Sequence, residues 1–186
     1  DNNGTPVANT DEPGPTLDCA PDVPGTDALA LYTFEQAPLV DSAGNHAANI
    51  VGDATNWALA LSRTGCGNAV HFNADNDGSY VRVSDHADWA QTAGSADVWV
   101  YFEACPPAGE EPALLSRDLV GGTNGDMHAL LRDDCTIELR VQAEGEALGF
   151  ETFALDGILA TGVWHHFGIN WGTGGFEAWV DGSREL

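Results

Sequence analysis

The chain has 186 residues and carries 6 basic against 29 acidic side chains, giving a formal net charge of −23 with no lysine at all. Nucleic-acid binding requires clustered basic side chains that neutralise phosphates, so this composition excludes it, and anionic membrane surfaces are disfavoured for the same reason. Hydrophobic residues make up 43% of the chain, which is enough for a core. No apolar run reaches the roughly 18 residues that a membrane-spanning helix needs.

The N-terminal segment, residues 1–26, is rich in Pro, Gly, Thr, Asn and Asp and has almost no apolar periodicity. A segment of this composition cannot bury a core of its own. We therefore predict an extended arm or linker over residues 1–26, followed by a single domain over residues 27–186.

From residue 28 onwards, short runs of strand-like residues alternate with turn residues. A short turn at 85–89 is the one helical indication. Residues 97–104 are nearly continuous in apolar side chains, which predicts a central strand covered on both faces. The turn sequence at 75–78 predicts a hairpin between its two flanking strands. The expected strands are 28–35, 68–72, 80–84, 97–104, 114–118, 127–132, 136–141, 149–154, 164–171 and 176–180.

Many short strands at this spacing favour an all-β fold, a two-sheet antiparallel sandwich. Within 136–141, strict alternation places Ile137, Leu139 and Val141 on one face of the strand. That face is the one expected to point into the core.

The four cysteines, Cys19, Cys66, Cys105 and Cys135, lack the spacing of a zinc site. An even number in a lysine-free, Asp-rich and Gly-rich chain indicates two disulfides formed in an oxidising compartment, although four free buried thiols are the alternative. Three connectivities are possible. We favour Cys19–Cys66, which would attach the arm to the domain, and Cys105–Cys135, which would join a strand end to a nearby hairpin.

Five motifs in one order resemble the laminin-G-like family of concanavalin A-like jelly rolls. The resemblance covers residues 28 to 186 and implies a jelly-roll sandwich. Because that family continues with further strands after the last motif, we expect the closing strands to be absent through truncation, or to be supplied by another segment. The motifs are Leu31–Glu35 with Asp41–Asn45, Gly67–Phe72 with Asp77–Val83, Ala96–Val100, Trp164–Phe167, and Phe176–Gly182.

The sequence predicts that the protein is not an enzyme. Glucanases of the related fold place paired carboxylates on alternate positions of one strand, about 5 Å apart in retaining enzymes. Glu144 and Glu146 have such a spacing, but they lie in a Gly-interrupted region that is typical of a turn. Nucleophile-elbow, zinc-protease and phosphate-loop motifs are all absent.

Calcium is the cofactor that the acidic loops favour, because hard cations bind carboxylate, amide and carbonyl oxygens. The resemblance supports one candidate loop, with Asp41, Gly44 and Asn45 as ligands. A second loop, with Asp75 and Asp77, is suggested by carboxylate density alone. The same residue types also favour β-turns without any metal, so the turn interpretation stays open.

The C-terminal hairpin predicts a sugar-binding face. If residues 172–175 form its loop, the core face carries Phe167, Ile169, Trp171, Phe176, Ala178 and Val180. The other face pairs Asn170 with Glu177, Gly168 with Trp179, and His166 with Asp181. Trp179 would stack on a sugar ring while His166, Asn170, Glu177 and Asp181 bind its hydroxyls. Alternatively, this face packs under a second sheet or a loop, with Gly168 leaving room for the indole.

Two functions follow from these observations. The first is a secreted or cell-surface binding module, stabilised by calcium, that recognises a glycan or another extracellular ligand. The second is a structural subunit of an extracellular filament or surface assembly, in which the N-terminal arm completes a neighbouring subunit.

Overall fold

The computed structural model describes residues 25–73, 78–117, 126–142, 151–155 and 157–186. The chain forms two compact units, Asp1–Trp89 and Ala90–Leu186, which we describe one at a time. All strand pairs are antiparallel. Within the described ranges the one helix is a single 3₁₀ turn, η1 (Ala87–Trp89), and no helix there has the length and apolarity to cross a membrane. The prediction of one domain over residues 27–186 stays a prediction.

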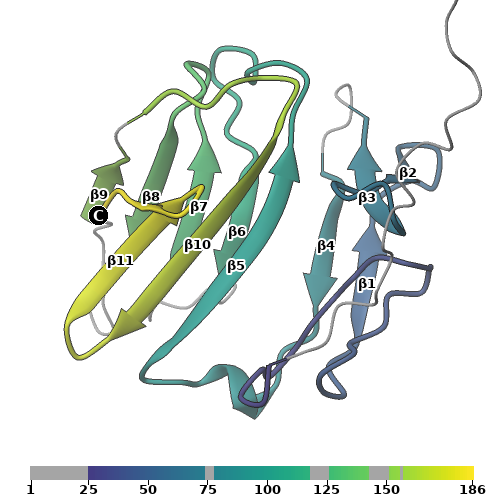
Figure 1. Ribbon diagram of the computed structural model, residues 1–186, viewed down its shortest axis with the longest axis horizontal. Coiled ribbons are helices and arrows are strands. Elements are labelled where there is room, and N and C mark those ends of the chain that lie inside the picture. Colours follow the sequence, from purple (N-terminus) through teal and green to yellow (C-terminus); the bar gives the residue numbers. More distant parts are fainter. Residues whose placement is uncertain (1–24, 74–77, 118–125, 143–150, 156) are drawn as a thin grey trace, which may run out of the picture. The chain divides into compact units, whose positions relative to one another are not determined.

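The second unit is a sandwich of two four-stranded sheets that lie face to face (Figure 1). The first sheet has the order β12-β11-β10-β5, and the second has the order β6-β7-β8-β9. This confirms the predicted all-β antiparallel sandwich, while jelly-roll topology stays a prediction. The strands are β5 (Gly94–Tyr101), β6 (Ala113–Arg117), β7 (Met127–Leu131), β8 (Ile137–Val141), β9 (Glu151–Ala154), β10 (Trp164–Gly172), β11 (Gly175–Val180) and β12 (Ser183–Arg184).

The core of this unit lies between its two sheets and is built from alternate residues of their inner faces. Ile137 and Leu139 of β8 are buried, as the alternation in 136–141 predicted, and Val141 packs against them partly buried. Phe167 and Ile169 of β10 enter from the opposite sheet with 0% and 1% exposure. Full burial of such a side chain contributes about 1.5–3 kcal/mol to the free energy of folding. These inner-face side chains are therefore a main source of stability in the unit.

A disulfide joins Cys105, which follows β5, to Cys135 in the turn between β7 and β8, with Cα atoms 5.1 Å apart. This confirms the second predicted pair. Cys135 is almost fully buried, and its carbonyl accepts a hydrogen bond from Leu159 N at 2.9 Å. Cys66 is also disulfide-bonded, and its predicted partner, Cys19, lies outside the described residues.

The first unit contains two two-stranded sheets, β1-β4 and β2-β3. The predicted hairpin between residues 68–72 and 80–84 is wrong, because β3 pairs with β2 and β4 pairs with β1. Ser62 N donates to Gly67 O and closes the turn that makes β2 and β3 neighbours. Strands β1 and β2 are absent from the predicted elements. The bounds are β1 (Ala48–Val51), β2 (Trp57–Leu61), β3 (Asn68–Phe72) and β4 (Tyr80–Val83).

Two further strand predictions need correction. Residues 28–35 do not form a strand: only an isolated bridge joins Tyr32 to Asp41, and Phe34 has a left-handed φ of 58°. The backbone there bonds to the next loop instead, since Leu31 N donates to the Asp41 carboxylate. Strand β5 is confirmed near its predicted position, but it is an edge strand with alternately exposed side chains and is not covered on both faces.

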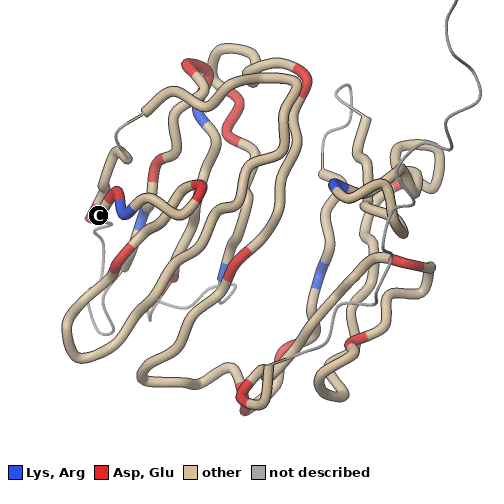
Figure 2. Tube along the Cα trace, viewed as in Figure 1, with Lys and Arg blue, Asp and Glu red and all other residues tan. Residues whose placement is uncertain are grey.

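The acidic positions are spread over both units, and the few basic positions stand among them (Figure 2). Among the described residues of the second unit, Arg132, Arg140 and Arg184 have acidic partners. Arg132 and Arg140 both form ion pairs with Glu111 and with Glu138. These partly exposed pairs offset part of the self-repulsion that the net charge of −23 produces.

Candidate functional site

The outer face of the sheet formed by β5, β10 and β11 carries a row of aromatic side chains. Trp99 and Tyr101 of β5 are 43% and 45% exposed. Across the β5–β10 pair, Trp99 is opposite His166 and Tyr101 is opposite Trp164. The Trp99 and His166 rings are stacked with centroids 4.7 Å apart, and the Tyr101 and Trp164 rings are 5.6 Å apart. Two neighbouring strands therefore present two cross-strand aromatic pairs side by side.

Strand β11 extends this face with the residues that the sequence predicted. Trp179 is opposite Gly168, and Asn170 is opposite Glu177, so the predicted register of the β10–β11 hairpin is confirmed. A Cβ on Gly168 would meet Asp97 Cβ at an ordinary 3.6 Å, so room for the Trp179 indole does not require a glycine there.

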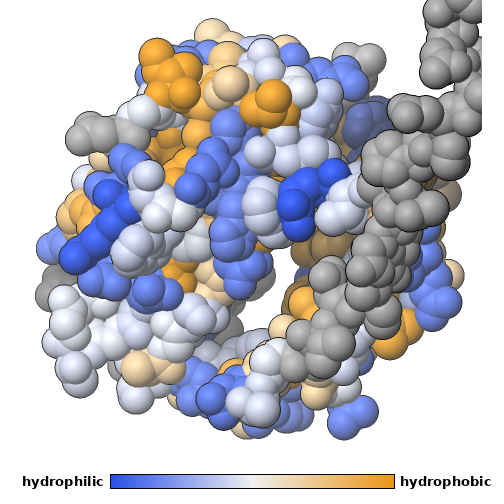
Figure 3. Space-filling model, in the orientation of Figure 1, coloured by the Kyte–Doolittle hydropathy of each residue, from blue (hydrophilic) through white to orange (hydrophobic). Residues whose placement is uncertain are grey.

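Polar groups lie on the same face as these rings. Asp97 accepts a hydrogen bond from His166 Nε2 at 2.9 Å, which fixes the imidazole against Trp99. Arg184 of β12 pairs with Glu177 at 3.0 Å. Figure 3 views the molecule from the side of this sheet, with pale and blue side chains over much of the sheet and strongly apolar ones near the upper edge. Flat aromatic surface bordered by carboxylates and amides is the composition expected of a carbohydrate platform.

Asp181, also predicted on this face, makes its contacts beside the turn after β11. Its Oδ1 accepts from His166 N at 2.8 Å, and its Oδ2 bonds His165 Nδ1 at 2.7 Å. His165 is buried, and its Nε2 donates to Ala160 O at 2.9 Å. Burial alone would lower the pKa of His165, but the Ala160 and Asp181 acceptors outweigh it and raise that pKa. Asp181 therefore holds the β10–β11 hairpin in place.

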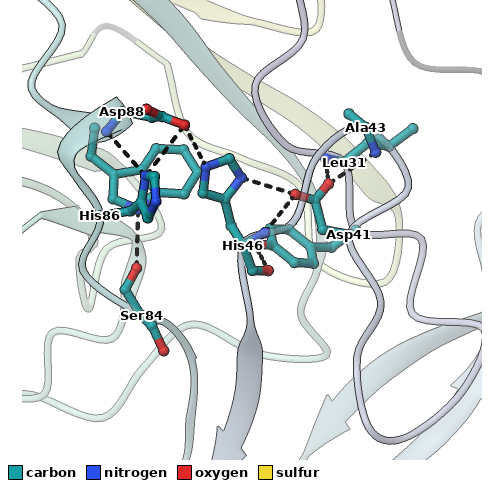
Figure 4. Close-up of polar contacts among 9 residues, drawn as sticks. Leu31, Asp41, Ala43, His46, Ser84, His86 and Asp88 are labelled. Carbon is teal, nitrogen blue, oxygen red and sulfur yellow. Dashed lines mark hydrogen bonds and ion pairs between the residues drawn. The ribbon is translucent and has the colours of Figure 1, made fainter.

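A second cluster lies in the first unit, around the Asp41 carboxylate (Figure 4). Oδ1 accepts from Leu31 N at 2.8 Å and from Ala43 N at 3.0 Å. Oδ2 accepts from His46 N at 3.2 Å and bonds His46 Nδ1 at 3.0 Å. Burial alone would raise the pKa of Asp41, but backbone N–H donors, including that of Gly44, hold it well below the usual range.

These contacts bear on the predicted calcium loop of Asp41, Gly44 and Asn45. An ionised carboxylate offers about four lone-pair positions, and Leu31 N, Ala43 N, His46 N and His46 Nδ1 already occupy such positions on Asp41. Gly44 lies where the backbone passes this carboxylate: a Cβ there would be 2.9 Å from both Asp41 Oδ2 and His46 Nδ1. Asn45 is exposed. Calcium binding stays a prediction, and the second proposed loop, Asp75 and Asp77, lies outside the described residues.

His46 connects Asp41 to η1. Its Nε2 lies 3.1 Å from Asp88 Oδ2, and the nearby His86 Nδ1 lies 3.3 Å from the same oxygen. The hydrogen bond to Asp41 raises the pKa of His46 against the effect of burial, and Asp88 adds to the rise. The sequence prediction missed His46, His86 and Asp88. The available signals were a histidine directly after Asn45 and the His-x-Asp pair at 86–88.

No protein-family model matches the chain, and no curated protein matches it. Among solved structures, the chain is similar to an S-layer domain-containing protein (residues 221–444) from Clostridium thermocellum ATCC 27405. The two are 21% identical, with a TM-score of 0.54, over 84% of this chain and 70% of that one. At this identity the similarity shows a shared all-β fold.

Proposed function

We propose that the chain is a non-catalytic module of a cell-surface or extracellular protein, and that it binds neutral carbohydrate on the outer face of β5, β10 and β11. The observation that carries this proposal is the aromatic row on that face. Trp99, Tyr101, Trp164 and Trp179 come from three adjacent strands, with Asp97, Asn170 and Glu177 among them.

The chemistry of this face matches a sugar ring better than it matches other ligands. Indole and phenol rings pack against the apolar C–H faces of sugars, while carboxylates and amides accept or donate hydrogen bonds to hydroxyls. The chain carries a net charge of −23, so an acidic polysaccharide would be repelled. Neutral glycans are therefore the ligand class that we assign.

The extracellular location rests on three observations. Cys105 and Cys135 form a disulfide and Cys66 is also bridged, and such bridges persist in oxidising compartments. The shared fold with an S-layer domain-containing protein agrees with a surface location. The acidic, lysine-free composition suits a soluble surface in a salt-rich medium.

The test is affinity electrophoresis of the whole chain through gels that contain a neutral β-glucan, a neutral α-glucan or a polyanionic polysaccharide. We expect retardation by a neutral glycan, and a roughly tenfold weaker affinity in the Trp99→Ala and Trp179→Ala variants, because an aromatic contact contributes about 0.5–1.5 kcal/mol beyond its buried area. Tyr80→Ala is the matched control, since Tyr80 is 46% exposed on β4 of the other unit.

Equal retardation of the wild type and the three variants would contradict the assignment of this face. No retardation by any neutral glycan would contradict the assigned ligand class. Circular dichroism of each variant separates loss of binding from loss of fold. If the Trp179→Ala chain unfolds, that indole has a structural role. The affinity of the Trp99→Ala variant would then decide whether this face binds the glycan.

A structural subunit of a surface assembly is the second candidate, and the S-layer domain similarity is the observation that favours it. The N-terminal arm proposed to link subunits lies within residues 1–26, of which 1–24 fall outside the described residues. Native mass spectrometry of the whole chain and of a chain lacking residues 1–18 tests this function. Assembly that depends on the arm would support it, and a monomer in both cases would contradict it.

A further inference from the structure

We propose that His46, His86 and Asp88 form a binding site for one divalent transition-metal ion, with zinc as the best fit, and that Asp41 orients His46 for this role. All four residues belong to the unit Asp1–Trp89. The proposal is thus independent of the carbohydrate face, and either can fail without the other.

The first argument is the orientation of the buried histidine. His46 Nδ1 lies 3.0 Å from Asp41 Oδ2, and the side chain of His46 is 7% exposed. Nδ1 donates to this carboxylate, and Nε2 donates to Asp88 Oδ2, 3.1 Å away, so a metal ion that replaces the Nε2 proton would meet the Nε2 lone pair on the side of Asp88. Metal-binding histidines commonly give their second N–H to a carboxylate, which fixes the ring and raises its basicity.

Asp41 is itself held rigidly, so the imidazole has a fixed position. Backbone N–H groups, among them those of Leu31, Ala43 and His46, donate to its two oxygens. The Trp89 ring also packs against the His46 ring, with centroids 4.4 Å apart, and Trp89 Nε1 donates to Ser84 O at 3.0 Å. A ligand fixed in this way loses little conformational freedom when a metal binds.

The second argument is the spacing of the ligand atoms. Zinc bonds of about 2.0–2.1 Å to nitrogen and oxygen at tetrahedral angles place neighbouring ligand atoms about 3.3 Å apart. Asp88 Oδ2 lies 3.1 Å from His46 Nε2 and 3.3 Å from His86 Nδ1. The three ligand atoms fall within 4.8 Å of one another, so only the two nitrogens must approach more closely.

The two nitrogens can approach each other through rotation of the outer ligands, His86 and Asp88, whose side chains are exposed. The side chain of His86 is 55% exposed, and that of Asp88 is 49% exposed. His86 Nδ1 accepts a hydrogen bond from Asp88 N at 3.2 Å, so its lone pair already lies on the side of Asp88 (Figure 4). A buried, fixed histidine and two outer ligands leave a fourth coordination position for water or for a group from a partner.

The third argument is ligand type. Two imidazoles and one carboxylate suit zinc and related transition metals, whereas calcium binds six to eight oxygens. The cluster differs in this respect from the calcium loop predicted next to it, in which Asp41 would be a direct ligand. In the zinc site Asp41 is a positioning residue and His46 is its contact to the metal.

The experiment is isothermal titration of the chelator-treated whole chain with zinc chloride, at physiological ionic strength and with a large excess of calcium present. The excess calcium occupies the non-specific carboxylate sites that a chain of net charge −23 offers. We test His86→Ala and Asp88→Asn, because both side chains are at least 49% exposed and we expect the fold to tolerate their substitution. His71→Ala is the matched control, an exposed histidine on β3 of the same unit.

We expect one zinc ion per chain that calcium does not displace, at least tenfold weaker binding in both cluster variants, and unchanged binding in His71→Ala. The visible spectrum of the cobalt-substituted chain should show tetrahedral coordination that disappears in His86→Ala. Absence of zinc binding, or equal binding in all variants, would overturn the proposal. Displacement of the ion by calcium would instead assign the cation to the oxygen-rich loop.

Discussion

The imidazole of His166 lies stacked on the indole of Trp99, with ring centroids 4.7 Å apart and an angle of 22° between the planes. The two residues are directly opposite on β10 and β5, and Asp97 Oδ2 holds the imidazole at 2.9 Å. This contact joins the predicted β10–β11 face to the edge strand β5 and makes the two parts one continuous surface.

The first prediction is an energetic coupling between these rings. A double-mutant cycle of Trp99→Ala and His166→Ala should give an interaction free energy of about 0.5–1.5 kcal/mol in urea unfolding, since stacked aromatic pairs contribute that much beyond area burial. Trp99→Ala with Arg184→Ala is the control cycle. Those residues lie on the two edge strands of the sheet, and their effects should add.

The second prediction concerns pH and the His165–Asp181 pair. The folded-state pKa of His165 is raised, so its contribution to stability is complete below its ordinary value of 6.5 and is lost as pH rises through the folded pKa. The folded-state pKa of Asp181 is lowered, because hydrogen bonds from His166 N and His165 outweigh burial. Its contribution is complete above its ordinary value of 3.8 and is lost as pH falls through the folded pKa.

Both contributions are therefore present between about pH 4 and 6.5. Urea midpoints of the wild type and of Asp181→Asn should differ most in this window, and the difference should narrow towards alkaline pH. A difference that stays constant from pH 4 to pH 9 would show that the pair is not ionised in the folded state.

The third prediction concerns the Asp41 carboxylate. Asp41→Asn places an NH₂ group against two of its donors, so at least one charge-assisted hydrogen bond is lost. We expect a loss of roughly 2–3 kcal/mol in the free energy of unfolding. Asp53→Asn is the control, because the exposed Asp53 carboxylate accepts from Thr55 N and Thr55 Oγ1, and asparagine serves the same turn. Equal effects of the two substitutions in chemical denaturation would contradict a special role for Asp41.

The fourth prediction concerns the Cys105–Cys135 disulfide, which joins residues 30 positions apart. In the chain-entropy model, cross-linking a loop of this length lowers the conformational entropy of the unfolded chain. This raises the free energy of unfolding by about 3.6 kcal/mol at 25 °C. A Cys105→Ala, Cys135→Ala double variant should lose about this free energy in chemical unfolding. A loss below about 1 kcal/mol would show that the disulfide contributes little to the stability of the sandwich.

The sequence by itself determined the all-β class, the core face of β8 and the register of the β10–β11 hairpin, and it favoured the Cys105–Cys135 pair among three possible connectivities. In each strand or hairpin case the information is local: side chains in a strand alternate with a period of two, and a short loop between Gly172 and Gly175 fixes which residues are opposite. Trp179 and Asn170 could therefore be assigned to one face from the sequence alone.

Only the tertiary structure decided what lies beside that face and which residues gather around His46. His166 and Asp97 are 69 positions apart in the sequence, and His46 and Asp88 are 42 apart. Contacts over such separations depend on which strands become neighbours, as the mistaken pairing of residues 68–72 with 80–84 demonstrates. Alternation specifies which way a side chain points along its own strand, but long-range strand pairing specifies which side chain it meets.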